Sequence, residues 1–151
     1  RMKLRELFTP NVVNLRLTSK TKAETLEQLV SLLQLDEKSE GILFKTLKRR
    51  ENLGSTGIGR GIAIPHCRSL VVSRLCLAYG RSAGGVEFKA IDDEPVHNFF
   101  LIVAPPLEVS NQYLPVLGKI AQFAKEEDIP TLLAGLEEPD EFLRLLDERA
   151  S

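Results

Sequence analysis

The sequence is poor in the residues that build metal sites, disulfide frameworks and membrane spans. Its 151 residues include two cysteines, two histidines and no tryptophan. Cys67 and Cys76 have neither CxxC spacing nor further cysteines to complete a zinc set, so we expect buried free thiols and no metal site. The apolar run 99–104 falls far short of the roughly 20 residues that a membrane helix needs. No charged-then-apolar leader opens the chain, so we expect a cytoplasmic protein without direct membrane insertion.

The sequence also lacks an excess of charge of either sign. The formal net charge is -1, and 27% of the residues are charged. Because no basic field is available to hold a polyanion, we do not expect a nucleic-acid partner, and a transient protein partner fits better. A hydrophobic content of 43% and the length of the chain predict one globular domain over residues 1–151. We expect no cofactor.

Hydrophobic periodicity predicts helices interleaved with strands. We expect helices at 2–8, 23–33, 39–50, 114–124, 130–134 and 139–149, and strands at 12–17, 74–79, 86–90 and 99–104. The continuous apolar run 99–104 indicates a central strand buried on both faces. Strands between 74 and 104 are joined by turns, one of them at 83–85, and so must pair partly antiparallel. We predict an α/β fold with α+β character, in which helices sandwich a mixed sheet of about five strands.

Three helix starts carry candidate capping residues. The segment 18–22 precedes the first long helix, Ser39 is placed to cap the second, and Ser110 or Asn111 is placed to cap the third. The expected inward stripe of this third helix consists of Leu114, Leu117, Ile120, Ala121 and Ala124.

A glycine-dense segment leads to the first histidine. Residues 54–61 hold four glycines, and the apolar residues 62–64 and Pro65 follow before His66. A lone histidine is usually a surface or satisfied core residue, but such a loop can expose successive N–H groups to a phosphate. Its simpler interpretation is a wide turn.

Several neighbours of this segment are suited to phosphate. Arg50 offers a rigid fork of donors, although charged helix ends usually face water. Ser55, Thr56 and Gly57 are candidates for a phosphate loop, although such hydroxyls more often cap turns. Together with His66 they fit a reaction in which imidazole attacks phosphorus and its product passes the group on.

The run 50–67 resembles the phosphorylation-site signature of fructose/mannitol-type enzyme IIA domains of the phosphoenolpyruvate-dependent phosphotransferase system. That signature asks for an acidic or amide residue, an apolar-glycine pair, and apolar-Ala-apolar-Pro-His followed by a small residue. Every position is met, by Glu51, by Ile58-Gly59, by Ile62-Ala63-Ile64-Pro65-His66 and by Cys67. The resemblance implies that His66 is phosphorylated by the histidine phosphocarrier protein and that Arg50 neutralises the phosphoryl group. It also implies an enzyme IIB or a regulatory protein as acceptor.

One position departs from the family. Many relatives carry a second histidine at the start of the helix after the Ala-Pro strand, where this chain has Tyr113. A phenol donates one hydrogen bond but is neutral near pH 7, so charge stabilisation from a second imidazolium is missing. The other histidine, His97, is interpreted as a strand-edge residue. Cys67 is read as a small residue beside the nucleophile rather than a redox switch.

Within the family, the sequence Gly-Ser-Thr-Gly-Ile-Gly at 54–59 resembles the stand-alone nitrogen-regulatory kind. The absence of an attached IIB or membrane segment also favours this kind over sugar uptake. A domain excised from a longer polypeptide is the other interpretation, and the opening Arg1-Met2 is one sign of it. An apolar rim near Ile58 and Ile62 is expected to dock the donor. The alternative function is a regulatory or sensor module that no longer transfers phosphate, while a hydrolase using His66 as base lacks a nucleophile or carboxylate at fixed spacing.

Overall fold

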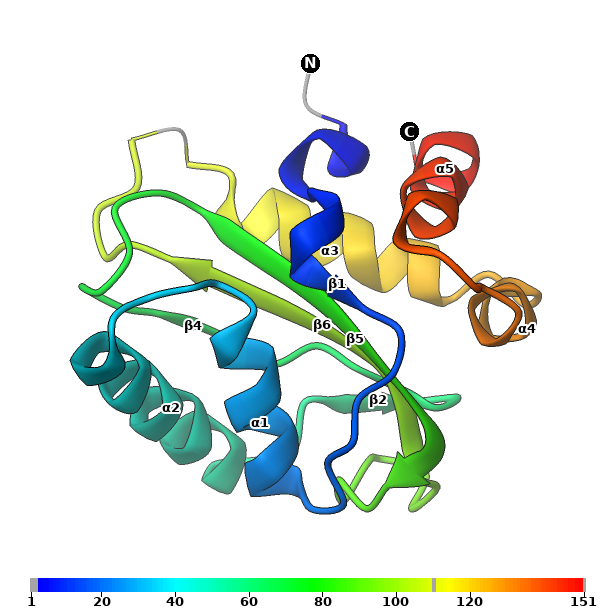
Figure 1. Cartoon of the computed structure of the whole chain (residues 1–151), viewed down its shortest axis with the longest axis horizontal. Coiled ribbons are helices and arrows are strands. Elements are labelled where there is room, and N and C mark those ends of the chain that lie inside the picture. The colour runs from blue at the N-terminus through cyan, green and yellow to red at the C-terminus, as the bar shows by residue number, and fades with distance from the viewer. Residues whose placement is uncertain (1–2, 110, 151) are drawn as a thin grey trace.

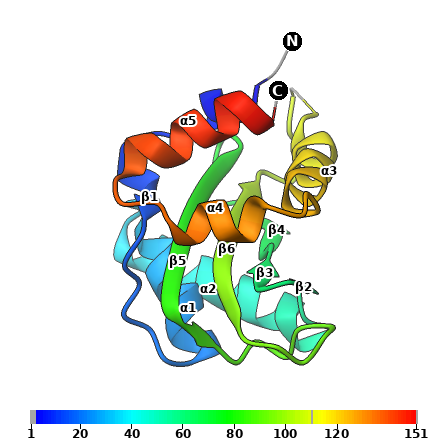
Figure 2. The ribbon, with the colours of Figure 1, turned by 90° about the vertical axis from the view of Figure 1, so that its right-hand side faces the viewer.

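The computed structural model describes residues 3–109 and 111–150, which form a six-stranded mixed sheet with helices on both faces (Figure 1, Figure 2). The α-helices are α1 (Lys22–Ser31), α2 (Glu37–Asn52), α3 (Tyr113–Ala124), α4 (Ile129–Ala134) and α5 (Pro139–Arg149), and the short 3-10 helices η1 (Leu4–Leu7) and η2 (Pro10–Val12) precede them. The strands are β1 (Val13–Asn14), β2 (Gly57–Gly59), β3 (Ile62–Ala63), β4 (His66–Arg68), β5 (Cys76–Val86) and β6 (Val96–Ala104).

Strand β6 lies at the centre of the sheet. The strand order is β1-β5-β6-β3-β2, and β4 also pairs with β6. β5 runs antiparallel to β6, whereas β3 and β4 run parallel to it. Phe100 and Ile102 point into the core formed with α3, α4 and α5, while Phe99 and Leu101 point into the core formed with α1 and α2. The predicted central strand, buried on both faces, and the helix sandwich are confirmed.

The first long helix begins as predicted, whereas the second does not. Thr21 caps α1 through a capping box with Glu24, within the predicted segment. The second helix begins earlier than expected, because Asp36 is its N-cap and accepts the Ser39 N–H at 2.8 Å. A carboxylate three residues before Ser39 therefore takes the role that we assigned to the serine. The last helix, α5, has the predicted bounds.

The buried face of the third long helix, α3, is rotated by about one residue from the predicted inward stripe. Its N-cap is Gln112, which makes no side-chain cap, and the Glu108 carboxylate accepts the N–H groups of Gln112 and Tyr113 instead. Asn111 is therefore not the cap, and Ser110 lies outside the described residues. Leu114 is 67% exposed. The buried residues of α3 are Tyr113, Val116, Ile120, Phe123 and Ala124.

The strand predictions differ most from the structure. β1 covers two residues rather than 12–17, and the expected opening helix is only η1, with Met2 outside the described residues. The segment 83–85 is not a turn between strands but an irregular part of β5, where Gly85 has a φ of +82°. Phe88 and Ala90 are buried as the alternation indicated, yet 87–90 is not a strand. β2, β3 and β4 were not predicted, although His66 was expected at a strand end.

Candidate functional site

His66 is the first residue of β4. The carbonyl of Pro65 accepts the Ile102 N–H at 3.0 Å, so β6 holds the chain immediately before the histidine. His66 Nδ1 lies 2.7 Å from the carbonyl oxygen of Ile64. Because a carbonyl oxygen only accepts, Nδ1 carries the proton and Nε2 keeps its lone pair. The half-buried ring is therefore held in the tautomer in which Nε2 is nucleophilic.

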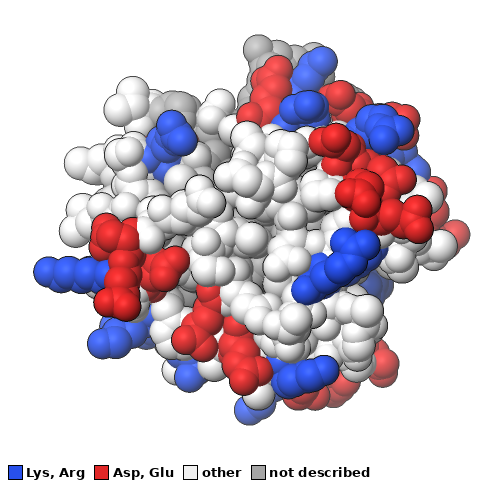
Figure 3. All heavy atoms as spheres, in the orientation of Figure 1, with Lys and Arg blue, Asp and Glu red and all other residues white. Residues whose placement is uncertain are grey.

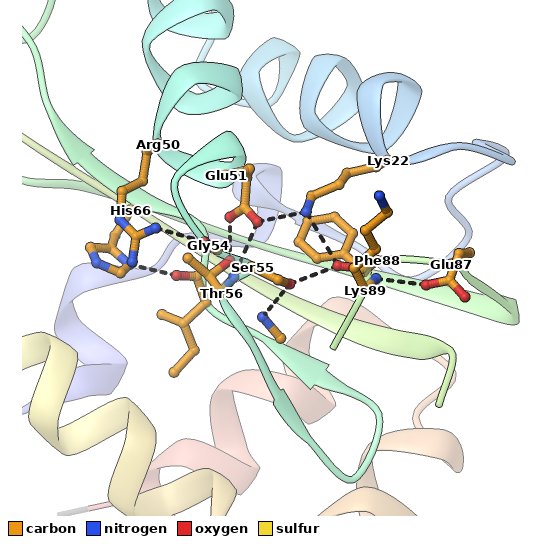
Figure 4. A network of polar contacts seen from close by, with 12 residues as sticks. Lys22, Arg50, Glu51, Gly54, Ser55, Thr56, His66, Glu87, Phe88 and Lys89 are labelled. Carbon is orange, nitrogen blue, oxygen red and sulfur yellow. Dashed lines mark hydrogen bonds and ion pairs between the residues drawn. The ribbon is translucent and has the colours of Figure 1, made fainter. Parts of the chain in front are cut away.

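Arg50 reaches the same site from the last turn of α2, which contacts β4. Its Nη1 donates to the Gly54 carbonyl at 2.7 Å, so one of the five N–H groups of the guanidinium is used (Figure 4). None of the ion pairs among the described residues involves Arg50. The positive charge also acts on the phenol of Tyr113, whose pKa it lowers against the larger effect of burial. An anion on His66 would therefore meet an uncompensated guanidinium.

The hydroxyls of the predicted phosphate loop point into hydrogen bonds of the loop itself. Ser55 Oγ donates to the Phe88 carbonyl at 2.6 Å and accepts the Gly57 N–H at 3.0 Å (Figure 4). The Thr56 hydroxyl donates to the Glu51 carboxylate. A Cβ on Gly57 would lie 2.7 Å from that of Ala90, so the chain passes too close there for a side chain. Direct contact of these residues with a phosphoryl group stays a prediction.

Behind this loop lies a buried ion pair. Glu51 is 5% exposed, and its Oε1 lies 3.0 Å from Nζ of Lys22. The same oxygen accepts the Thr56 N–H at 3.1 Å. Lys22 also donates to the Phe88 carbonyl at 3.2 Å and lies 4.4 Å above the centre of the Phe88 ring. Glu51 and Lys22 thus fasten α1, α2, the glycine loop and the segment after β5 together (Figure 4).

Tyr113 takes the place beside His66. The centres of the two rings are 6.3 Å apart, and the tyrosine is 7% exposed. Burial, partly opposed by Arg68 and Arg50, raises the pKa of Tyr113 to about 12, so the phenol is neutral at pH 7. The guanidinium of Arg68 lies 4.5 Å above the tyrosine ring. The site therefore holds one imidazole, one neutral phenol and two arginines.

Comparison with known proteins identifies the family of the chain. Over residues 6–149 the chain matches the family described as "Phosphoenolpyruvate-dependent sugar phosphotransferase system, EIIA 2". The chain belongs to this family. The family resemblance read from residues 50–67 is thus confirmed.

Relatives of this EIIA domain come from both branches of the family. The nitrogen regulatory protein of Pseudomonas aeruginosa is 32% identical over 130 residues, which cover 85% of this chain and 84% of that protein. The fructose-specific EIIABC component of Bacillus subtilis is 32% identical over 149 residues, which cover 97% of this chain but only 23% of that protein.

Solved structures confirm the fold. The crystal structure of nitrogen regulatory protein IIA-Ntr from Neisseria meningitidis gives a TM-score of 0.86 at 29% identity, covering 95% of this chain and 98% of that one. Enzyme IIA mannitol from Escherichia coli, solved in complex with phosphorylated enzyme IIB, has the same fold, with a TM-score of 0.76 at 21% identity over 94% of this chain and 98% of that one. The predicted mixed sheet between helices is the fold of these proteins.

Sequence reasoning missed Arg68 in this EIIA domain. The residue follows His66 by two positions on β4, so both side chains leave the strand on the same face. Its Nη1 donates to the Pro105 carbonyl at 3.0 Å, which holds the guanidinium over Tyr113. The signal was present in the sequence, because a two-residue spacing within a strand places side chains side by side.

The expected apolar rim is only partly present. Ile58 is 42% exposed, but Ile62 is fully buried in β3 and cannot contact a partner, so that half of the prediction was wrong. The pairing of β3 with β6 turns Ile62 into the core. Large apolar side chains are exposed instead at Leu53, the C-cap residue of α2, and at Leu114 on α3, directly after Tyr113.

Figure 3 shows Lys and Arg interspersed with Asp and Glu around an uncharged middle. Within the described ranges, no three His, Cys, Asp or Glu side chains are grouped to hold a metal, and no helix has the length and apolarity to cross a bilayer. Both cysteines are free, but only Cys67 is buried and Cys76 is half-buried. His97 lies near the start of the central strand β6.

Proposed function

We propose that this EIIA domain is a phosphocarrier that takes a phosphoryl group on Nε2 of His66 from the histidine phosphocarrier protein. The Nε2 lone pair forms the new N–P bond while the N–P bond of the donor breaks, and that bonding pair stays on the donor nitrogen. The ring of His66 then carries a positive charge, because Nδ1 keeps its proton. The 2.7 Å hydrogen bond from Nδ1 to Ile64 stabilises this charge and is the observation that carries the proposal.

The second residue of the mechanism is Arg50. Four of its N–H groups remain after the bond to Gly54, and a guanidinium matches phosphoryl oxygens two at a time. We infer that Arg50 neutralises the transferred group during the passage between nitrogens, when charge spreads over its oxygens. Release reverses the step: an acceptor nucleophile forms a bond to phosphorus, and the N–P pair returns to Nε2.

We further propose a protein acceptor or target rather than a small substrate. The mannitol enzyme IIA was solved bound to a phosphorylated enzyme IIB, which makes an enzyme IIB one candidate. The likeness to nitrogen regulatory proteins over more than four-fifths of their length favours regulatory binding, in which the phosphoryl charge switches the partner. We infer that residues 1–151 act as one EIIA domain in the cytoplasm.

The site is tested by phosphorylation with purified components. The wild-type chain and His66→Gln are incubated with phosphoenolpyruvate, enzyme I and the histidine phosphocarrier protein, and intact mass is recorded. We expect one phosphoryl group on the wild type and none on the variant. The chain has two histidines, so a variant that still gained the group would move the site to His97. An unmodified wild type would end the carrier proposal.

The role of Arg50 is tested by rate. Arg50→Gln keeps a donor for the Gly54 carbonyl but loses the charge, and we expect phosphoryl uptake to slow roughly 100-fold, as when one preorganised donor is removed. Arg49→Gln is the matched control, since Arg49 is exposed on the preceding position of α2. Rapid-quench uptake from the phosphorylated donor measures both. Equal rates for the two variants would remove Arg50 from the mechanism.

A second function follows from Tyr113. Because no second imidazole lies beside His66 among the described residues, the alternative function is a sensor module. Such a module would bind its target without gaining or losing a phosphoryl group. The uptake experiment separates the two functions, because only a carrier acquires and loses the group. Addition of a cognate enzyme IIB, followed by loss of the phosphoryl group from His66, would distinguish transfer from storage.

A further inference from the structure

A cavity unconnected with the phosphorylation chemistry lies under α4. Its volume is about 360 Å³, and it is bounded by α4, by the turn between β2 and β3, and by the ends of β5 and β6. Figure 2 shows α4 crossing β5 and β6 on this side of the molecule. The cavity reaches β6 at Asn98, whereas His66 pairs with β6 at Ile102, four residues or roughly 13 Å further along the strand. The two sites occupy different ends of the sheet.

Two arginines line the cavity. Arg60 uses three of its five N–H groups, on the carbonyl of Ala124 at the end of α3 and on those of Glu126 and Glu127 just after it. Arg81 also uses three, on the carbonyl of Leu15 and on those of Leu133 and Ala134 at the end of α4. Both guanidiniums therefore keep two unused donors each.

The Asp92 carboxylate accepts the main-chain N–H of Arg60 at 3.0 Å but forms no ion pair with its guanidinium. Neither Arg60 nor Arg81 takes part in an ion pair among the described residues. The cavity lining contains neither Asp nor Glu. Carbonyl dipoles satisfy part of the hydrogen bonding of the two cations but do not cancel their charge. A concave space with two uncompensated cations is an environment that favours an anion.

Buried polar side chains complete the inner wall. Ser82 is 4% exposed, and its Oγ accepts the Gly85 N–H at 3.1 Å. Asn98 is also 4% exposed, and its Oδ1 accepts from the Tyr79 hydroxyl at 2.5 Å while Nδ2 makes only a long contact of 3.5 Å with Gly61. The Ser82 hydroxyl and the Asn98 amide thus retain donors. Such groups fix the orientation of a ligand in a small-molecule pocket.

We propose that the α4 cavity binds a small anionic metabolite whose carboxylate or phosphate group is held by Arg60 and Arg81. The lining also includes Pro130, Ala83 and Ala134, which suit a short apolar body. The volume lies at the small end of the range for ligand pockets, so the ligand is compact. The proposal is independent of phosphoryl transfer at His66, and either can fail without the other.

The cavity is tested by NMR titration of the full chain labelled with nitrogen-15. Succinate, citrate and inorganic phosphate are added separately at constant ionic strength, with sodium chloride as the reference salt. We expect saturable shifts of the amides of Gly61, Ser82 and Ala134, but not of His66, for at least one probe. The probe that saturates at the lowest concentration shows whether the site prefers carboxylate or phosphate. No saturation by any probe up to about 20 mM would overturn the proposal, since weaker binding is worth less than roughly 2.3 kcal/mol.

A pair of variants separates this cavity from general charge effects. Arg81→Gln is unsuited, because it also removes hydrogen bonds that end α4. Ala134→Glu instead adds a carboxylate at an exposed position of the lining, and Thr131→Glu adds the same charge on an exposed residue of α4 outside the lining. We expect Ala134→Glu to weaken binding at least about tenfold, as like charge opposes the anion, and Thr131→Glu to bind as the wild type does. Equal weakening by both, or by neither, would refute the assigned site.

Discussion

Replacing Lys22 by methionine isolates the cost of leaving Glu51 charged and unpaired inside the protein. The two side chains are 21% and 2% exposed, respectively, and their charged atoms are 3.0 Å apart. Methionine keeps an apolar stem against the Phe88 ring but removes the ammonium group. The Thr56 N–H and hydroxyl still bind Glu51, so the carboxylate keeps hydrogen bonds and loses its counter-charge.

The size of the effect follows from this geometry. Breaking a buried ion pair by removing one partner costs about 3–5 kcal/mol, because the remaining charge is uncompensated. Partial exposure of Lys22 lets water reach the vacated position, so we expect about 3 kcal/mol for Lys22→Met. For a chain of this length that lowers Tm by roughly 6–12 °C. Glu51→Gln leaves only the charge of Lys22, which water can reach, and should cost only about 1–2 kcal/mol, mainly through weaker hydrogen bonds to Thr56.

Urea unfolding followed by circular dichroism measures these free energies, provided that the m-values agree. Lys20→Met is the control. Lys20 is exposed, so this variant removes the same charge and should cost no more than about 0.5 kcal/mol. The double variant Lys22→Met/Glu51→Gln should cost less than the sum of the single changes, because the stranded charge is gone. A cost for Lys22→Met no larger than that for Glu51→Gln would show that Lys22 does not compensate the buried carboxylate.

Burial raises the pKa of Tyr113 to about 12 and that of Tyr79 further, so both tyrosines should stay un-ionised in the folded protein at pH 11. Their folded pKa values lie above the unfolded value, so this contribution to stability is complete below about pH 10 and is lost as the pH rises toward 12. Tyrosinate absorbance measures it, and ionisation of both near pH 10 without unfolding would contradict the prediction. For the cysteines, burial raises the pKa of the Cys67 thiol to about 12, so we expect iodoacetamide at pH 8 to alkylate the half-buried Cys76 at least about tenfold faster. Peptide mapping measures the two rates, and faster alkylation of Cys67 would restore the redox-switch interpretation.

The sequence predicted the strongly patterned elements of the fold. The continuous apolar run at 99–104 indicated a strand buried on both faces, and Pro139 before an apolar stripe indicated the start of the last helix. The segment 86–90 shows why alternation is not sufficient. Phe88 and Ala90 are buried as a strand face would be, but the Phe88 carbonyl bonds to side chains of Lys22 and Ser55 instead of a neighbouring strand.

For the candidate site, the local sequence predicted residues but not their contacts. His66 and Arg50 are recognisable because a glycine loop connects a helix end to a strand. The contact of Tyr113 with Arg68 depends on how α3 packs beside β4, and the cavity arginines Arg60 and Arg81 are brought together from separate loops and strands. Such contacts between distant segments leave no periodic trace in a single sequence.

The last turn of α2 positions both Arg50 and the start of the glycine loop. Arg50 and Glu51 are adjacent, yet Arg50 turns toward His66 while Glu51 turns inward to Lys22 and Thr56 (Figure 4). The inward bonds fix the start of the loop, and the bond from Arg50 to Gly54 fixes the guanidinium to that same loop. Because Glu51 and Arg50 both depend on the last turn of α2, the buried ion pair sets the place of the cation that would receive phosphate. Within this loop, Gly57 allows the close passage of the chain against Ala90, whereas Gly54, Gly59 and Gly61 have positive φ values, which favour glycine.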